Sequence, residues 1–234
     1  GPVEVLEGRF GLFASHLQNA ELKLDYAMLT DKLGEHWESE YASFKPYPVA
    51  HVIHPYIDAL FRVLAANKIK AADIQSINCP VSEYIVGIVC EPVAEKRRPL
   101  SDSHGRVSLQ YTLAEAAVLG KITRHSYTPA ALANPEILQL ADRISFYVDK
   151  DFPGPERFKG QVEVVLHSGQ RYTETEEHNR GSLHNPMTDT EIFDKFYTNI
   201  AGVLSQAQGK ALIEKVMTMT ETAPARNIID ATIA

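Results

Sequence analysis

The densest group of chemically useful side chains in this sequence lies in one short stretch. It reads Lys45-Pro46-Tyr47-Pro48-Val49-Ala50-His51-Val52-Ile53-His54-Pro55, and we call it the lysine–histidine run. A residue before a proline is disfavoured in the α region, so Lys45 and Tyr47 are expected to be extended. Pro55 suits the first turn of a helix, where its missing N–H costs nothing. The run therefore predicts an extended segment that delivers a lysine and two histidines to a helix N-terminus.

This group of side chains suits proton transfer beside a bound carboxylate. Lys45 can bind the carboxylate, and the positive end of the helix dipole favours a neutral imidazole at His54 that accepts a proton. His51 can bind substrate or support His54. We therefore predict Lys45 and His54 as catalytic residues and His51 as a substrate-binding residue. The alternatives are structural: a helix-capping role for His54, a supporting role for His51 and a surface position for Lys45.

Two arginines outside the run are further candidates for binding an anionic substrate. Arg106 precedes a helix that Ser108 can cap, and Arg98 lies in a basic loop before a proline. An ordinary salt bridge is the alternative for Arg106, and a solvated loop is the alternative for Arg98. The spacing of His51 and His54 lacks a third ligand nearby, so we expect no metal, and no motif indicates a cofactor.

Composition limits the class of protein. The 234 residues are 44% hydrophobic, which is enough for a sizeable core, and the net charge of -7 argues against nucleic-acid or membrane partners. Two cysteines, Cys79 and Cys90, are too few for a disulfide scaffold. We find no signal-peptide pattern and no apolar span of membrane length. A cytoplasmic protein is expected, or a mitochondrial matrix protein in a eukaryote.

Hydrophobic periodicity and capping signals predict an α+β fold. Helices are expected near residues 1–20, 55–67, 109–120, 135–140, 190–204 and 210–219, and strands near 74–79, 83–90, 144–148, 162–166 and 172–173. We predict an α+β domain over 48–175, flanked by helical segments at 1–47 and 176–234. The flanking helices are too few to enclose a bundle core, so they are expected to belong to an all-α domain largely missing from this chain.

Several stretches, taken in order, resemble one known family. Residues 45–48 read KPYP and residues 54–59 read HPYIDA, which is similar to the KPYP…HPxIDA signature of the MmgE/PrpD superfamily. Residues 6–11 (LEGRFG) resemble the segment that leads into the family's second domain. Residues 106–111 (RVSLQY) and 185–188 (NPMT) resemble its KFSLPY helix start and its NPMS turn. The resemblance covers most of the chain.

The resemblance implies a fold and a class of substrate. Family members have a large all-α domain and a smaller α+β lid domain, are commonly homodimers, and act on substrates with two or three carboxylates between the two domains. We therefore expect an oligomer, in which another chain or an upstream segment supplies the helical domain. This chain would then form one wall of a lyase active site for a small di- or tricarboxylate.

The resemblance leaves the reaction open. Dehydration of a 2-methylcitrate-like substrate, by proton abstraction next to a carboxylate, is the first choice. Some decarboxylases of the family have a catalytic histidine two residues after the second proline, where this chain has Ala50. The alternatives are a non-catalytic subunit or binding homologue, an epimerase or isomerase, and a decarboxylase on the same scaffold.

Overall fold

The computed structural model describes residues 3–19, 21–220, 224 and 226–232. It divides into two compact units, residues 1–40 and 41–234. The first unit contains helix α1 (Leu12–Leu17) and the 3-10 helix η1 (Tyr26–Leu29), and η2 (Glu38–Tyr41) lies at the boundary. Helix α1 is thus shorter than the helix expected near 1–20. The predicted boundaries at 47/48 and 175/176 stay predictions.

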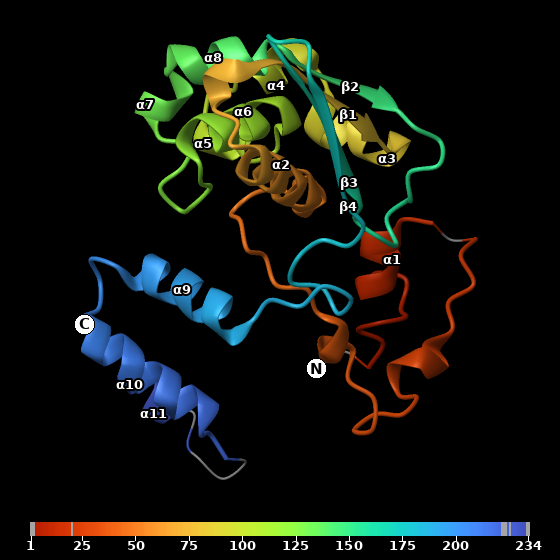
Figure 1. Cartoon of the computed structure of the whole chain (residues 1–234). Coiled ribbons are helices and arrows are strands. Elements are labelled where there is room, and N and C mark those ends of the chain that lie inside the picture. The colour runs from red at the N-terminus through yellow and green to blue at the C-terminus, as the bar shows by residue number, and fades with distance from the viewer. Residues whose placement is uncertain (1–2, 20, 221–223, 225, 233–234) are drawn as a thin grey trace. The chain divides into compact units, whose positions relative to one another are not determined.

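A four-stranded mixed sheet forms the centre of the second unit (Figure 1). Its strands are β1 (Ile74–Val81), β2 (Ile144–Val148), β3 (Gly160–Leu166) and β4 (Arg171–Glu176), in the order β2-β1-β3-β4. Strand β1 pairs with β2 in parallel and with β3 in antiparallel orientation, and β3 and β4 form an antiparallel hairpin. The strand and hairpin expected from alternating Val162, Val164 and Leu166 are confirmed.

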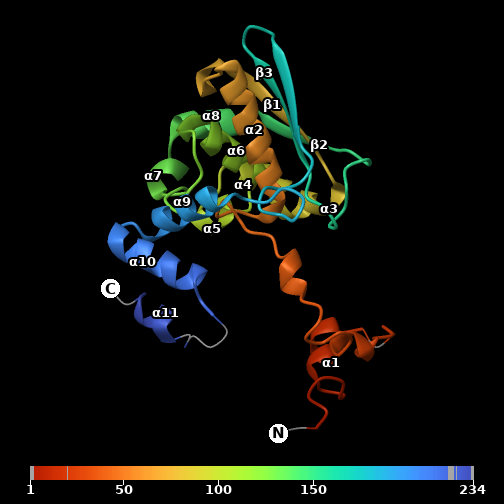
Figure 2. The same cartoon turned by 60° about the horizontal axis from the view of Figure 1, so that its bottom comes forward.

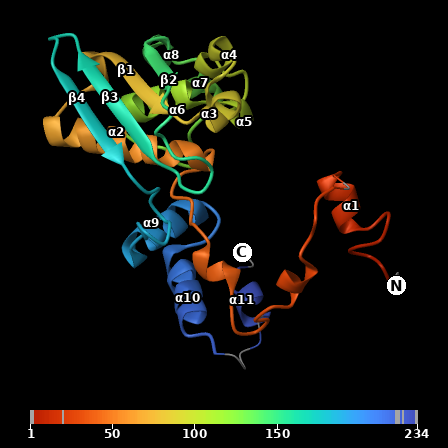
Figure 3. The same cartoon turned by 90° about the vertical axis from the view of Figure 1, so that its right-hand side faces the viewer.

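Helices α2 (His54–Asn67) and α6 (Leu109–Leu119) cover one face of this sheet (Figure 3). Val162 and Val164 point into the covered face and are fully buried, whereas the intervening Glu163 pairs with Arg171 on the exposed face. Helix α8 (Pro135–Ala141) packs on the far side of α6. A strand buries alternate residues, so one polar and one covered face follow from the sequence. The predicted α+β fold class is confirmed.

The helices begin and end at the residues that their capping signals favour. Pro55 lies in the first turn of α2, and the side chain of Ser108 accepts the Tyr111 N–H at 3.3 Å at the start of α6. Gly120 ends α6 in the left-handed conformation with φ 67°. Between these two helix starts, the middle of the lysine–histidine run lies next to Arg106, whose carbonyl accepts the Ala50 N–H at 2.8 Å.

One element differs from the prediction. Residues 83–90, expected as a strand, form the short helix α3 (Glu83–Ile85) and the π-helical turn η5 (Val86–Cys90). Ile85 and Val89 are buried at helical spacing while Ile88 is 49% exposed. Short apolar runs do not distinguish strand from helix, and here packing on the core decided in favour of the helix. The remaining short elements are η3 (His51–Ile53), η4 (Ala71–Asp73), α4 (Val93–Arg97), α5 (Asp102–Gly105) and α7 (Pro129–Leu132).

Three helices, α9 (Asp189–Ile200), α10 (Gln206–Met217) and α11 (Arg226–Asp230), follow at the C-terminal end of the chain (Figure 2), and within them only Gly209 and Leu212 are buried. Thr188 and Glu191 form the predicted capping box of α9. Apolar side chains of the three helices line an open groove of about 270 Å³. Within the described ranges, no helix is both long and apolar enough to cross a membrane.

Candidate active site

The lysine–histidine run crosses from the edge of the second unit into the N-terminus of α2. Lys45 is exposed, and its Nζ donates to the Val49 carbonyl at 3.2 Å. Arg106 approaches the same turn and donates from Nη1 to the Pro48 carbonyl at 2.8 Å. The backbone N–H of Ala50 in turn donates to the Arg106 carbonyl at 2.8 Å. Lys45 and Arg106 therefore donate to the carbonyls of two consecutive residues, Val49 and Pro48.

His54, the predicted proton carrier, is fully buried behind this turn. Its Nε2 lies 3.4 Å from the Val49 carbonyl, which can only accept, so Nε2 carries the proton. The other nitrogen, Nδ1, is buried without a hydrogen-bond partner among the described residues. Burial above all, then the nearby His51 and Lys45, lowers the pKa of His54 to about 3. His54 is thus a neutral imidazole, as predicted, but burial rather than the helix dipole is the main cause.

His51 is the more accessible member of the histidine pair. It is half-buried, and its ring centroid lies 4.8 Å from that of His54. Its Nε2 lies 2.9 Å from Asn179 Nδ2 and 3.2 Å from Ser43 Oγ. Burial, and then the charge of Lys45, lowers the pKa of His51 below its ordinary value. His51 is therefore also neutral near pH 7, and its Nε2 accepts a hydrogen bond from the Asn179 side-chain amide.

A network that the sequence did not reveal holds the start of the run. The Tyr47 hydroxyl donates to Asp58 Oδ1 at 2.6 Å, and Arg180 Nη2 donates to the Tyr47 hydroxyl at 2.7 Å. Arg180 Nη2 also donates to Asp58 Oδ1 at 3.1 Å, and its Nη1 donates to Glu191 Oε1 at 2.6 Å. Burial and the Asp58 carboxylate raise the pKa of Tyr47, so it remains a phenol. One guanidinium thus ties the run to α2 and α9.

Arg180 is far from Tyr47 in the sequence, and no spacing rule connects them. The one nearby signal is the NPMT turn at 185–188, which follows Arg180 and begins α9. Tyr47 and Asp58 are both part of the quoted family motif, and that alone gave no reason to pair them. The packing of the loop after β4 against the run brings the three side chains together.

Two glycines allow the close backbone approaches that frame the run. Gly181 has φ +91°, and a Cβ there would collide with the Phe44 carbonyl. The Phe44 N–H donates to the Gly181 carbonyl at 2.9 Å, which joins the two segments. At Gly160, where β3 begins, a Cβ would lie 2.5 Å from the backbone nitrogen of Tyr56. Both ends of the run are therefore positioned by contacts that only glycine permits.

Arg98 is not brought to the run. Its Nη2 donates to Asp142 Oδ2 at 2.5 Å at the end of α8, and both side chains are partly exposed. The neighbouring Arg97 donates to the Ile144 carbonyl at 2.8 Å. These contacts anchor the basic loop to the sheet. A substrate role for Arg98 stays a prediction without support from its local geometry.

Three hollows surround the run. The largest, which we call the Arg106 pocket, has about 640 Å³. Its wall is formed by Pro99, Leu100, Ser101, Asp102, Arg106, Arg124, Ser126, Tyr127, Thr128, Pro129, Leu132 and Ala133. A second pocket of about 290 Å³ includes Ser43 and Asn179, the partners of His51. The first of these is large enough for a small organic ligand and includes a predicted substrate-binding residue.

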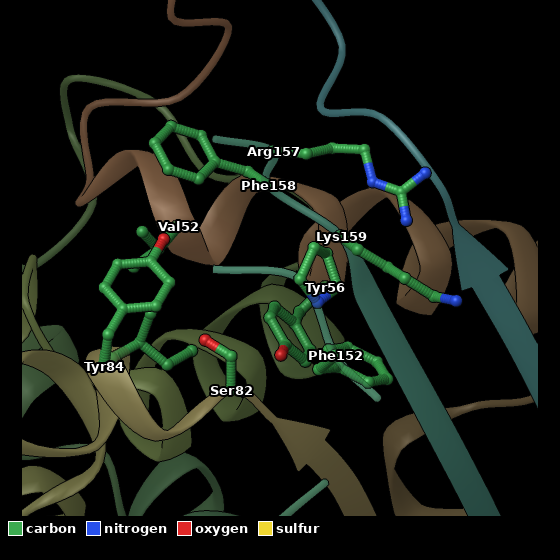
Figure 4. A pocket seen from close by; sticks show the side chains of 10 residues that line it. Val52, Tyr56, Ser82, Tyr84, Phe152, Arg157, Phe158 and Lys159 are labelled. Atoms are coloured by element: carbon green, nitrogen blue, oxygen red, sulfur yellow. The ribbon is translucent and has the colours of Figure 1, made fainter. Parts of the chain in front are cut away.

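The third hollow is too small for a substrate (Figure 4). It lies between Tyr56, Ser82, Tyr84 and Phe152, and has about 10 Å³, room for about one water molecule. The Ser82 hydroxyl is buried there without a hydrogen-bond partner among the described residues. Figure 4 shows the charged end of Lys159 pointing away from Ser82. In the described part of the chain, no three His, Cys, Asp or Glu side chains are grouped to hold a metal ion.

Comparison with known proteins identifies the family of this chain. The family model of the MmgE/PrpD C-terminal domain matches residues 47–219. The chain is 23% identical over 223 residues to human (Homo sapiens) cis-aconitate decarboxylase. That match covers 92% of this chain and 44% of the relative, so the chain spans less than half of the relative's length. On the strength of the family match, this chain belongs to the MmgE/PrpD family and carries its C-terminal domain.

Proposed function

We propose that this chain forms one wall of the active site of a lyase that acts on a small di- or tricarboxylate. The observation that carries the proposal is that Lys45 and Arg106 donate to the carbonyls of the consecutive residues Val49 and Pro48, next to the two histidines. No carboxylate among the described residues forms an ion pair with Lys45, and the ion pair of Arg106 is one contact of 3.8 Å with the exposed Asp102, which a substrate carboxylate could replace. Both cations can therefore bind substrate carboxylates.

The proposed reaction is dehydration of a 2-methylcitrate-like hydroxy-tricarboxylate. A neutral histidine takes the C–H proton next to a carboxylate, a C=C bond forms, and the hydroxide leaves as water after it receives a proton. Lys45 and Arg106 stabilise the charge that develops on the carboxylate. His51 is the more accessible candidate for the base because it is half-buried, whereas His54 is enclosed. As the base, His51 would exchange the hydrogen bond that its Nε2 accepts from Asn179 for the substrate proton.

The helical domain is part of the same proposal. The open apolar groove of α9, α10 and α11 supports a contact with helices that this chain does not contain. We propose that an upstream segment or another chain supplies them, together with the opposite wall of the active site, in an oligomeric assembly.

The test is turnover of 2-methylcitrate by the complete assembly that contains this chain. Replacing Lys45 by Met should lower kcat/KM by about 10²-fold or more, because a preorganised cation at the reacting carboxylate is lost. His51→Ala and His54→Ala show which histidine carries the proton. Wild-type turnover in Lys45→Met would remove the lysine from the mechanism. Release of CO2, or inversion of a stereocentre without water loss, would assign a decarboxylase or an epimerase instead.

A non-catalytic binding homologue is the second candidate. The observation that favours it is the full burial of His54, whose pKa of about 3 makes it a weak base near pH 7. This candidate expects calorimetric binding of citrate-like ligands without turnover. Measurable turnover that depends on either histidine would eliminate it.

A further inference from the structure

We propose that Arg124 is a second cation of the Arg106 pocket, so that Arg106 and Arg124 bind two different carboxylates of one polycarboxylate ligand. This inference rests on the proposed function and extends it. Nothing in the sequence motifs selected Arg124, which lies between α6 and α7. The structure places it on the wall of the same pocket as Arg106.

The size and charge of the Arg106 pocket suit such a ligand. Its volume of about 640 Å³ lies within the usual range for small-molecule sites. Two of its lining side chains are cationic, Arg106 and Arg124, and one is acidic, Asp102. Ser126 and Thr128 also line the wall, and their hydroxyls accept the N–H groups of Thr123 and Ala131 within the protein. The pocket thus has an excess of positive charge within a chain whose net charge is -7.

Arg124 is held in place by neutral groups only. Its Nη2 donates to the Ala201 carbonyl at 2.6 Å, at the end of α9, and its Nε donates to His125 Nε2 at 3.1 Å. Within the described residues, no carboxylate pairs with Arg124 and its Nη1 has no hydrogen-bond partner. The exposed side chain is therefore oriented by the protein and has no carboxylate partner among the described residues. A ligand carboxylate would supply the missing counter-charge.

The wall on the Arg106 side is rigid. The Arg106 guanidinium lies 5.3 Å from the centroid of the Tyr127 ring. Tyr127 has φ +62°, a conformation that a non-glycine residue keeps only when its surroundings fix it. Its N–H donates to Glu115 Oε1 at 2.9 Å, and its hydroxyl is 3.0 Å from Thr112 Oγ1. Arg106 is thus supported by a fixed platform, as expected for a preorganised binding site.

The experiment measures binding of tricarballylate, a tricarboxylate without a hydroxyl group to eliminate, to the intact protein by calorimetry. Arg124→Gln should weaken binding about tenfold, since one charge-assisted contact is lost, and Arg124→Lys should restore most of it. Binding of butyrate, which has one carboxylate, should change far less. Arg171→Gln, which removes an exposed arginine paired with Glu163 on the sheet, is the matched control.

A second readout does not depend on a variant. On addition of tricarballylate to the wild-type protein, the Nε–H NMR signals of Arg106 and Arg124 should both shift, and that of Arg171 should not. If the Arg106 signal alone shifts, or if Arg124→Gln binds like Arg171→Gln, the inference about Arg124 is wrong while the proposed function stands. If the wild-type protein binds no carboxylate at all, both proposals fall.

Discussion

Arg180 and Arg106 contact the same eleven-residue run and have opposite surroundings. Arg180 has two carboxylates and a phenol within hydrogen-bond distance, Asp58, Glu191 and Tyr47. Arg106 has a backbone carbonyl, an aromatic ring and a carboxylate 3.8 Å away, and it faces an open pocket. An arginine whose charge is already compensated stabilises the fold. One whose ion pair is a single long contact with an exposed carboxylate, as for Arg106 and Asp102, remains able to bind an anion.

The comparison shows how one run can be both rigid and reactive. Tyr47 and Asp58 are fixed through Arg180, so the backbone between them presents the Pro48 and Val49 carbonyls at defined positions. Lys45 and Arg106 are in turn oriented by those carbonyls. Arg180 holds the run in place, and the run in turn orients Arg106 through the Pro48 carbonyl. Four predictions test this division, in order of decreasing effect.

Arg180→Ala should lower the free energy of unfolding by about 3 kcal/mol, because it leaves Asp58 as an uncompensated buried carboxylate. Urea denaturation measures the loss, with the exposed Arg171→Gln as control. Arg180→Lys should recover only part of the stability, because an ammonium group lacks the planar guanidinium that contacts Tyr47, Asp58 and Glu191 at once. A loss as small as that of the control would contradict the structural role of Arg180.

Gly181→Ala should destabilise the protein by about 2 kcal/mol, since φ +91° is strained for alanine and the new Cβ meets the Phe44 carbonyl. Thermal unfolding measures the change. Gly169→Ala is the matched control: Gly169 has φ +86°, but a Cβ there has open space. The difference between the two variants isolates the contact with Phe44, and equal losses would mean that only backbone strain matters.

His54 should make stability depend on pH. Its pKa is lowered to about 3 in the folded state, so the unfolded chain binds more protons below pH 6.5. Its contribution is complete well above pH 6.5 and is lost as the pH falls towards 3; between pH 6.5 and 5.0 the loss is on the order of 1 to 2 kcal/mol. His54→Gln should show a flatter dependence in that window. Parallel curves for the variant and wild type would contradict a buried, neutral His54.

Arg106→Gln should cost little stability, about 1 kcal/mol or less, because its partners are a backbone carbonyl, an aromatic ring and the exposed Asp102 carboxylate at 3.8 Å. The same variant should lose affinity for tricarballylate, which Arg98→Gln should retain because Arg98 pairs with Asp142. Calorimetry and urea denaturation on both variants make the measurement. A large stability loss without an affinity change in Arg106→Gln would reverse the roles assigned to Arg106 and Arg180.

Local signals in the sequence were enough to predict several helix starts, one hairpin and the family of this protein. Alternation of Val162 and Val164 gave the hairpin, Ser108 and Thr188 gave two helix starts, and Pro55 gave the first turn of α2. The family motifs identified the family and pointed to the lysine–histidine run. Each of these depends on residues close together in the chain, so propensity and spacing are enough. The strand expected over 83–90 was wrong because burial on the core, rather than the local pattern, chose a helix there.

Only the tertiary structure decided which charges are compensated. Sequence ranked Arg98 and Arg106 alike and gave no reason to consider Arg180 or Arg124. Folding pairs Arg98 with Asp142 and Arg180 with Asp58, and leaves Arg106 and Arg124 on one pocket. Burial likewise, more than any helix dipole, makes His54 neutral. The physical reason is that ion pairing and desolvation depend on distances between residues far apart in the chain, which spacing in the sequence does not encode.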